Sequence, residues 1–413
     1  MIKETYATTK KETTLTITNN EITAVQKSNT TKTGIRLYNN GYIGIAGAIG
    51  AYDETKLIDH AKTKLTFKIP YNCDPTHATK RTEDFASDFT LTVPEFVQKT
   101  ETLLARLKSE YPNFNFNHKI ALQEVEIKLI NDLSTDFTYR DKTVQVVLLI
   151  KHKKSKNLAD SYGLYLSREF DLDAAFKAIT ESCAIYDEKV TVPDGKMPVV
   201  LLLSPEMLLE KFYGDLNGRA MGTGASMFAG KIGKKLFADN FTLLVDHDPL
   251  EYGCFFDSEG TVLPNNKIAL IENGILKSPF SCKKIAKQYG YTPTGSAGGD
   301  YDSVPAISTE GINIKSSGKT LNELLDNRKA IYVVMASGGD FTAQGEYASP
   351  IQAAFLMENG KLTGRLPQLS MSSHIYDMFG ADFIGRATDS NVPNSPFKYL
   401  ALNMDVSTIG DWL

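Results

Sequence analysis

Glycine is distributed unevenly along this chain, and that asymmetry constrains the fold more than any other feature of the sequence. Residues 1–190 contain 6 of the 30 glycines, whereas residues 191–413 contain the other 24. In this second part, short apolar runs alternate with turn sequences such as Asp-Ser-Glu-Gly and Glu-Asn-Gly. Glycine and asparagine tolerate the positive φ that tight turns between strands require. Residues 191–413 are therefore predicted to form a large, mostly antiparallel sheet or a curved, barrel-like body.

In the first part of the chain, strand patterns alternate with helix patterns. Polar and apolar residues alternate in 13–28, as they do in a half-buried strand, while two strands are expected in 33–50 and two antiparallel strands in 124–152. The second of these segments contains Asn39-Asn40-Gly41, which has the composition of a hairpin turn. Amphipathic helix patterns cover 53–65, 92–111 and 171–189. Asp53, at the start of the first helix pattern, is a suitable N-cap.

The expected fold class is α+β, with two domains. An N-terminal α+β domain is expected at 1–190 and a β-rich, mostly antiparallel C-terminal domain at 191–413. A length of 413 residues agrees with two or three domains. The segment from Val190 to Met197 combines proline, aspartate and glycine, so it is the best candidate for the linker.

Composition argues against several classes of protein. Hydrophobic residues make up 42% and charged residues 23% of the chain, as in soluble globular proteins. The net charge of −4 and the lack of a basic cluster argue against nucleic acid as a partner. The first residues lack the apolar segment of a signal peptide, and the apolar runs are too short to cross a bilayer. A cytoplasmic protein without a membrane partner is therefore expected.

Four cysteines are present: Cys73, Cys183, Cys254 and Cys282. None forms a C-x-x-C pair, which argues against a zinc ribbon or a disulfide framework. The glycine-rich segment 218–230 lacks the final Gly-Lys-Ser/Thr of a phosphate loop, and its glycines follow an expected helix instead of opening one. A close-packed crossing of the backbone is the expected reason for these glycines.

The most tempting metal-binding sequence is Asp246-His247-Asp248. Neighbouring strand residues point to opposite faces, so at most two of these side chains could reach one ion. A solvated turn that ends at Pro249 is the simpler interpretation. Asp257 and Glu259 would share one face of a strand, but beside Gly260 they too are expected in a solvated turn. The residues alone therefore indicate no catalyst.

Several stretches nevertheless resemble one protein family. The first has the order Gly-x-Ser-x-Phe-x-Gly-x-x-Gly, at Gly224, Ser226, Phe228, Gly230 and Gly233. Three more stretches follow the same family: LLVDHDP, FFDSEGTVLPNNKIALIENGILKS and MASGGDFTAQGEYASPIQAAFLMENGKL. Near the start, TGIRLYNNGYIGIAG is similar to the family's opening. The chain resembles the TldD/PmbA family, also called TldD/TldE or modulator of DNA gyrase proteins, over nearly its whole length.

The resemblance also indicates a type within the family. TldD-type chains carry His-Glu-x-x-x-His just before the glycine segment, whereas PmbA/TldE-type chains lack it. Counting back from Phe228 places the motif on 209–214 of this sequence. Both histidine positions are lost, to Leu209 and Gly214, and only the glutamate position is matched, by Glu210. Glu210 is expected to be a surface carboxylate on an amphipathic helix.

TldD-type chains also carry a later Cys as a third zinc ligand. Its position falls near 349–351, and no Cys follows Cys282. A catalytic zinc site needs three protein ligands and an open position for water. The resemblance therefore implies a PmbA/TldE-type chain with no metal ligand, no cofactor and no catalytic residue of its own, and with zinc only in a TldD-type partner.

The implied function is that of a non-catalytic metallopeptidase subunit. It would pair with a zinc-bearing TldD-type chain, or with itself as a homodimer, to degrade or mature unfolded peptides. Strand addition at a sheet edge is a generic way to bind such peptides. The candidate substrate-binding residues lie in the glycine segment 222–233, which we expect beside an interior cavity: Gly224, Ser226, Phe228 and Gly230.

Two other functions stay open. One is a stand-alone hydrolase with an unusual site built from Asp246, His247, Asp248 or Glu259. The other is a regulator that acts on DNA gyrase, as one name of the family suggests. The acidic net charge argues against direct contact between this chain and DNA.

Overall fold

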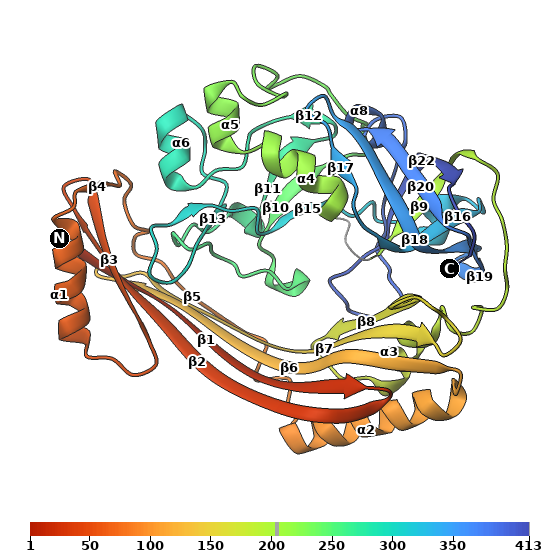
Figure 1. Ribbon diagram of the computed structural model, residues 1–413. Coiled ribbons are helices and arrows are strands. Elements are labelled where there is room, and N and C mark those ends of the chain that lie inside the picture. Colours follow the sequence, from red (N-terminus) through yellow and green to blue (C-terminus); the bar gives the residue numbers. More distant parts are fainter. Residues whose placement is uncertain (203–205, 413) are drawn as a thin grey trace.

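The computed structural model describes residues 1–202 and 206–412. Two parts are distinguished, the N-terminal half (1–190) and the C-terminal half (191–413). Long strands of the N-terminal half form a curved layer, and the C-terminal half lies against the concave side of that layer (Figure 1). Any cavity between the two layers is therefore lined by residues that are far apart in the sequence.

The N-terminal half contains one eight-stranded sheet in the order β4-β3-β2-β1-β6-β7-β5, with β8 paired to β7. Its strands are β1 (Ile2–Thr18), β2 (Glu21–Asn39), β3 (Tyr42–Ile49), β4 (Ile69–Pro70), β5 (Lys80–Asp84), β6 (Phe114–Asn131), β7 (Asp136–His152) and β8 (Ser161–Ser167). The expected turn at Asn40-Gly41 joins β2 to β3. The prediction of one strand over 13–28 was wrong, because Asn19 and Asn20 adopt φ values of 50° and 69° and turn the chain into the β1–β2 hairpin.

Three helices accompany this sheet: α1 (Glu54–Leu65), α2 (Val93–Glu110) and α3 (Leu172–Thr180). Asp53 caps α1 as expected, since its side chain accepts a hydrogen bond from the backbone N–H of Lys56. Thr92 and Glu95 form a capping box at the start of α2. The helix predicted over 171–189 is shorter in the structure, because α3 ends at Thr180 and the chain continues in turns.

The C-terminal half is rich in short strands. They are β9 (Gly195–Leu201), β10 (Leu243–Asp246), β11 (Lys267–Glu272), β12 (Ile275–Leu276), β13 (Ala297–Gly298), β14 (Ala306–Ile307), β15 (Ile312–Ile314), β16 (Ala330–Ala336), β17 (Asp340–Phe341), β18 (Glu346–Glu358), β19 (Lys361–Arg365), β20 (Leu369–His374), β21 (Phe383–Arg386) and β22 (Leu400–Thr408). The helices are α4 (Glu206–Asp215), α5 (Gly218–Thr223), α6 (Lys283–Tyr289), α7 (Leu321–Leu325) and α8 (Ile375–Met378), with 3₁₀ turns η1 (Pro249–Glu251) and η2 (Pro264–Asn266).

The largest sheet of this half closes on itself. Its strands follow the order β16-β9-β22-β20-β18, and β18 also pairs with β16. All of these neighbours are antiparallel except β9 and β16. A four-stranded sheet, β12-β11-β10-β15, lies beside this ring. The α+β class and the mostly antiparallel, barrel-like second half are thereby confirmed.

The segment expected to be the linker is held against the C-terminal half. The backbone N–H of Val190 donates to the carbonyl of Arg365 (3.0 Å), and β9 begins at Gly195. The division into domains at residue 190 remains a prediction. In the part of the chain that the structure describes, no helix is long and apolar enough to cross a membrane.

Candidate functional site

The helix that aligns with the TldD zinc motif is α4, and its inner face is apolar. Leu209, at the first histidine position, is 3% exposed and belongs to the same hydrophobic cluster as Tyr347 and Ile351. Glu210 is exposed, as expected, and so is Gly214 at the second histidine position. Leucine, glycine and isoleucine offer no donor to zinc, so these residues do not fit a zinc ion. Among residues 1–202 and 206–412, no group of three or more His, Cys, Asp or Glu could hold a metal ion.

Aromatic side chains fix α4 in this position. The ring of Phe212 lies 5.0 Å from that of Phe379 and 5.9 Å from that of Phe228, measured between centroids. Phe212 and Phe228 are fully buried. Packed aromatic pairs of this kind stabilise a core beyond the area that they bury. The first histidine position of the TldD motif is therefore occupied here by hydrophobic core.

In the glycine segment that follows α4, the side chains of Ser226 and Phe228 have a structural role. Ser226 Oγ donates to the carbonyl of Asp215 (2.6 Å) and accepts from the backbone N–H of Phe228 (2.8 Å). Phe228 exposes none of its side chain. Gly224 and Gly230 adopt φ of 79° and 71°, and a Cβ on either would meet no atom within 4 Å. The substrate-binding role of these four residues remains a prediction.

The expected close-packed backbone crossing is wrong for part of this segment. Gly224, Gly230 and Gly233 border open space, so their positive φ, and not close packing, accounts for glycine there. Gly222 does fit the expectation, because a Cβ there would lie 2.3 Å from the ring of Tyr289. An interior cavity beside Gly224, Gly230 and Gly233 would need a second chain to enclose it.

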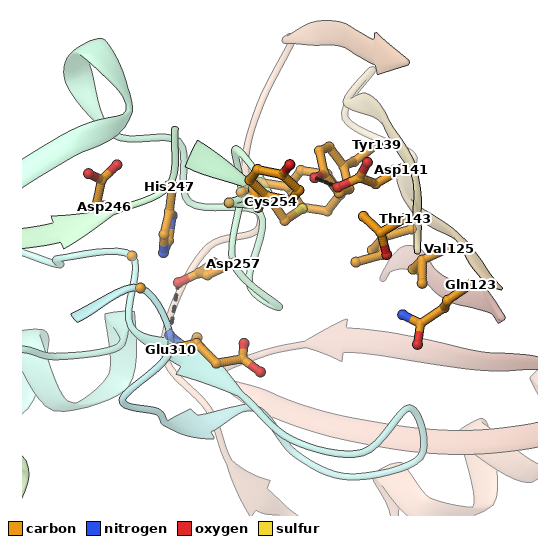
Figure 2. A pocket seen from close by; sticks show the side chains of 17 residues that line it. Gln123, Val125, Tyr139, Asp141, Thr143, Asp246, His247, Cys254, Asp257 and Glu310 are labelled. Carbon is orange, nitrogen blue, oxygen red and sulfur yellow. Dashed lines mark hydrogen bonds between the residues drawn. The ribbon is translucent and has the colours of Figure 1, made fainter. Parts of the chain in front are cut away.

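A cavity of about 400 Å³ lies between the two halves. One wall comes from β6 and β7 of the N-terminal sheet, with Gln123, Val125, Tyr139, Asp141 and Thr143 facing the cavity (Figure 2). The facing wall comes from the end of β10 and from loops of the C-terminal half, with Asp246, His247, Cys254, Asp257 and Glu310 (Figure 2). Concave sites between structural units are where ligands bind most often. The cavity is therefore our candidate functional site.

His247 does not lie in a solvated turn, and that prediction was wrong. It follows β10 directly, its backbone N–H donates to the carbonyl of Asn266 (2.8 Å), and its side chain is 6% exposed. Its Nδ1 is buried and has no hydrogen-bond partner. Burial lowers the pKa of His247 to about 4, so the imidazole is neutral at neutral pH. A buried polar atom without a partner is uncommon and calls for an explanation.

The carboxylates on either side of His247 are already paired with a lysine. Lys267 Nζ lies 3.2 Å from Asp246 and 3.3 Å from Asp248. Residues two apart share a face, so both carboxylates reach one cation while His247 points elsewhere. Asp248 also caps η1 through the backbone N–H of Leu250 (3.0 Å). The three side chains therefore do not converge on one ion.

Asp257 and Glu259 are also buried instead of solvated, so that second prediction of a solvated turn was wrong. They are 7% and 2% exposed. Asp257 Oδ1 accepts from the backbone N–H groups of Glu259 (2.9 Å) and Thr261 (2.8 Å), and its Oδ2 accepts from that of Ala297 (3.1 Å). Burial, and secondly the charge of Glu259, raise the pKa of Asp257 to about 7. Burial likewise raises the pKa of Glu259.

Glu259 joins the two halves. Tyr71 of the N-terminal half donates its hydroxyl to Glu259 Oε1, and the backbone N–H of Lys283 donates to Oε2 (2.7 Å). Next to it, Arg36 donates to the carbonyl of Ser258. Buried charges are tolerated only when they are paired and hydrogen-bonded. These hydrogen bonds stabilise the acidic residues that are buried where the two halves meet.

Arg36 is held from the other side by its own sheet. Its Nη1 lies 3.3 Å from Glu4 Oε1, and the two side chains are 1% and 0% exposed. Tyr38 also donates its hydroxyl to Glu4 (2.9 Å). We call Glu4, Arg36, Tyr71, Asp257 and Glu259 the junction network.

Sequence reasoning missed Glu4, Arg36 and Tyr71. Arg36 stands between the apolar residues Ile35 and Leu37, as an outward-facing residue of a half-buried strand would. No pattern near it signals that a loop more than 200 residues later covers that face.

The comparisons with known proteins agree with this fold and motif pattern. Residues 194–397 match the family described as the PmbA/TldA metallopeptidase C-terminal domain. The C-terminal half therefore contains a domain of the TldD/PmbA family. An uncharacterised protein of Methanocaldococcus jannaschii is 33% identical over 37% of this chain and 36% of its own length. A zinc metalloprotease TldD homolog of Saccharolobus solfataricus is 23% identical over 52% of this chain and 50% of its own length. These matches span about a third to a half of each relative.

Solved structures of TldD/PmbA proteins extend the likeness in fold to nearly the whole chain. TldE from Thermococcus kodakarensis has a TM-score of 0.77 at 17% identity, with 98% of this chain and 96% of that chain covered. A modulator of a DNA gyrase from Thermotoga maritima MSB8 gives the same values. Identities this low support a shared fold, including the curved sheet and the strand ring.

The geometry favours neither of the two alternative functions. A hydrolase would need a base beside a nucleophile, yet Asp246, Asp248 and Glu259 are engaged by Lys267, Tyr71 and Lys283. Cys254 in the cavity wall is an unsuitable nucleophile, because burial raises the pKa of its thiol to about 12. The net charge of −4 does not suit direct contact with DNA.

Proposed function

We propose that this chain is the zinc-free, TldE-type subunit of a TldD/TldE peptidase. The observation that carries the proposal is the replacement of both histidine positions on α4, by the buried Leu209 and the exposed Gly214. A TldD-type partner supplies the zinc and the activated water, in the cytoplasm. This chain supplies a wall of the chamber and holds the unfolded peptide.

The glycine segment is the part of this chain that we assign to the peptide. Gly224 and Gly230 leave open space beside their backbones, so a second chain or an extended peptide can approach closely. Backbone contacts of that kind accept many sequences, which suits unfolded substrates. Without a TldD-type partner, the chain associates with itself through the same surface as a homodimer.

The test is a reconstitution with a zinc-bearing TldD-type chain. An unfolded peptide is incubated with each chain alone and with the mixture, while size-exclusion chromatography follows assembly. Cleavage by the mixture that a chelator abolishes, with none by this chain alone, is the expected result. The matched control is Glu210→Gln, which should leave cleavage by the mixture unchanged. Chelator-insensitive cleavage by this chain alone, or a strict monomer in both samples, contradicts the proposal.

A further inference from the structure

The cavity between the halves is acidic. Among the described residues that line it, four are carboxylates and none is a lysine or an arginine. Two of the four are already neutralised from outside the cavity. Arg168 holds Asp141 with bonds of 2.8 and 3.0 Å, and Lys267 lies 3.2 Å from Asp246. The remaining two, Asp257 and Glu310, decide what the cavity attracts.

Glu310 is the carboxylate most available to a ligand. Its side chain is exposed, and within residues 1–202 and 206–412 its carboxylate has no hydrogen bond and no ion pair. Asp257 lies deeper and keeps its orientation through three backbone N–H groups. A cation in the cavity would therefore lie near the carboxylate of Asp257, which has a fixed orientation, and the carboxylate of Glu310, which can move to contact the cation.

His247 provides an independent sign of a missing ligand. It lines the same cavity, is 6% exposed, and has a buried Nδ1 without a partner. Glycine backbones approach the ring closely. A Cβ on Gly295 would lie 3.4 Å from Nδ1, and one on Gly311 would lie 3.2 Å from Nε2. Because the imidazole is neutral, Nδ1 accepts a hydrogen bond in the tautomer that has its proton on Nε2.

The wall from the N-terminal sheet has an apolar part. Val125, Ile127 and Tyr139 line it, and Phe256 adds a second aromatic ring from the opposite side. Apolar walls favour an alkyl chain. Aromatic rings also attract an ammonium group through their electron-rich faces.

We propose that this cavity binds a primary alkylammonium group, carried by a lysine side chain of a peptide or by a free polyamine. Glu310 neutralises the ammonium, His247 Nδ1 accepts one of its N–H groups, and the alkyl chain lies along Val125 and Tyr139. All of these residues belong to one chain. The proposal therefore concerns the isolated protein and stands or falls separately from the pairing with a TldD-type chain.

The experiment is isothermal titration calorimetry on the full chain without any partner. The probes are Nα-acetyl-lysine amide, spermidine and a lysine-containing pentapeptide. Nα-acetyl-norleucine amide keeps the alkyl chain but lacks the ammonium. Saturable binding of the amines, with none of the norleucine compound, is expected. Tighter binding of the pentapeptide indicates that a peptide lysine carries the ammonium group, and tighter binding of spermidine indicates a free polyamine.

Two variants locate the binding. Glu310→Gln should weaken amine binding by about tenfold, since a hydrogen bond to a charged group is lost. Gln123→Lys places an internal ammonium on the facing wall and should abolish binding. The matched control is Glu346→Gln, an exposed glutamate at the start of β18. Equal binding of the norleucine compound, or unchanged binding in both cavity variants, overturns the proposal.

Discussion

In two regions of the molecule, the structure differs from what the sequence suggests about where charged groups lie. The inner face of α4 aligns with a metal site, yet it packs Leu209 into a hydrophobic core. The segment 257–260 has the composition of a solvated turn, yet it buries Asp257 and Glu259 against the N-terminal sheet. The loss of metal ligands in the first region follows from residues 209 and 214 alone, whereas burial of the second depends on Arg36 and Tyr71 from far away. A local sequence pattern therefore predicts which chemical groups are present better than it predicts whether those groups are buried.

The largest expected effect breaks the junction network at Arg36. In Arg36→Met, Glu4 stays buried without its cation, because the two side chains are 1% and 0% exposed in the native pair. Removing one partner of a buried pair costs about 3–5 kcal/mol of the free energy of unfolding. Urea denaturation measures the loss. The control is Lys62→Met in the exposed pair with Asp59, which should cost less than about 1 kcal/mol. Equal losses in the two variants would refute the importance of this network.

A smaller effect is expected in the hydrophobic region. Leu209→Ala creates a cavity beneath α4 and should lower the free energy of unfolding by about 2–4 kcal/mol. The neighbouring Glu210→Ala, on the exposed face, should change it by no more than about 0.5 kcal/mol. Thermal and urea unfolding of both variants check this pair. A Leu209→Ala variant as stable as the native chain would mean that the α4 face is not packed as the structure shows.

The smallest effect is a pH dependence in which two cavity residues oppose each other. The folded-state pKa of Asp257 is raised to about 7, so its contribution to stability is present at low pH and is lost as pH rises from about 4 to 7. The pKa of His247 is lowered to about 4, so its contribution is lost as pH falls from about 6.5 to 4. Asp257→Asn should therefore leave a protein whose free energy of unfolding falls more than that of the native chain on acidification from pH 6.5 to 4.

Urea denaturation at several pH values measures this difference. His247→Asn is the matched variant and should respond in the opposite direction, with less loss on acidification. Parallel stability profiles for both variants would show that neither residue titrates across this range. The neighbouring Glu259 titrates in the same sense as Asp257, because burial raises its pKa too.

The sequence predicted elements whose signals are local. The cap at Asp53, the turn at Asn40-Gly41 and the antiparallel second half follow from residue types within a few positions. The loss of zinc ligands on α4 could also be predicted, since it depends on the identity of residues 209 and 214. The hairpin at Asn19-Asn20 was missed, although the four consecutive polar residues 18–21 interrupt the alternation there.

The cavity could not be predicted, because its two walls come from β6 and β7 and from loops more than 100 residues later. His247 looked like a turn residue, and only the packing of Gly253, Gly295 and Gly311 around it explains its burial. Glycines with positive φ near an isolated histidine are too common to indicate such a site. Side-chain burial in loops depends on long-range contacts that residue patterns do not encode.

The closed strand ring has a consequence for the order of events during synthesis. Leu201 of β9 pairs with both Val333 of β16 and Leu400 of β22, so the ring waits for strands that are synthesised long after β9. The N-terminal sheet has all its strands by Ser167 and can assemble earlier. Until the ring closes, both edges of the apolar strand β9 are available to other chains. The newly made protein is therefore most prone to aggregate between the completion of β9 and the arrival of β22, and this interval is where chaperones would protect it.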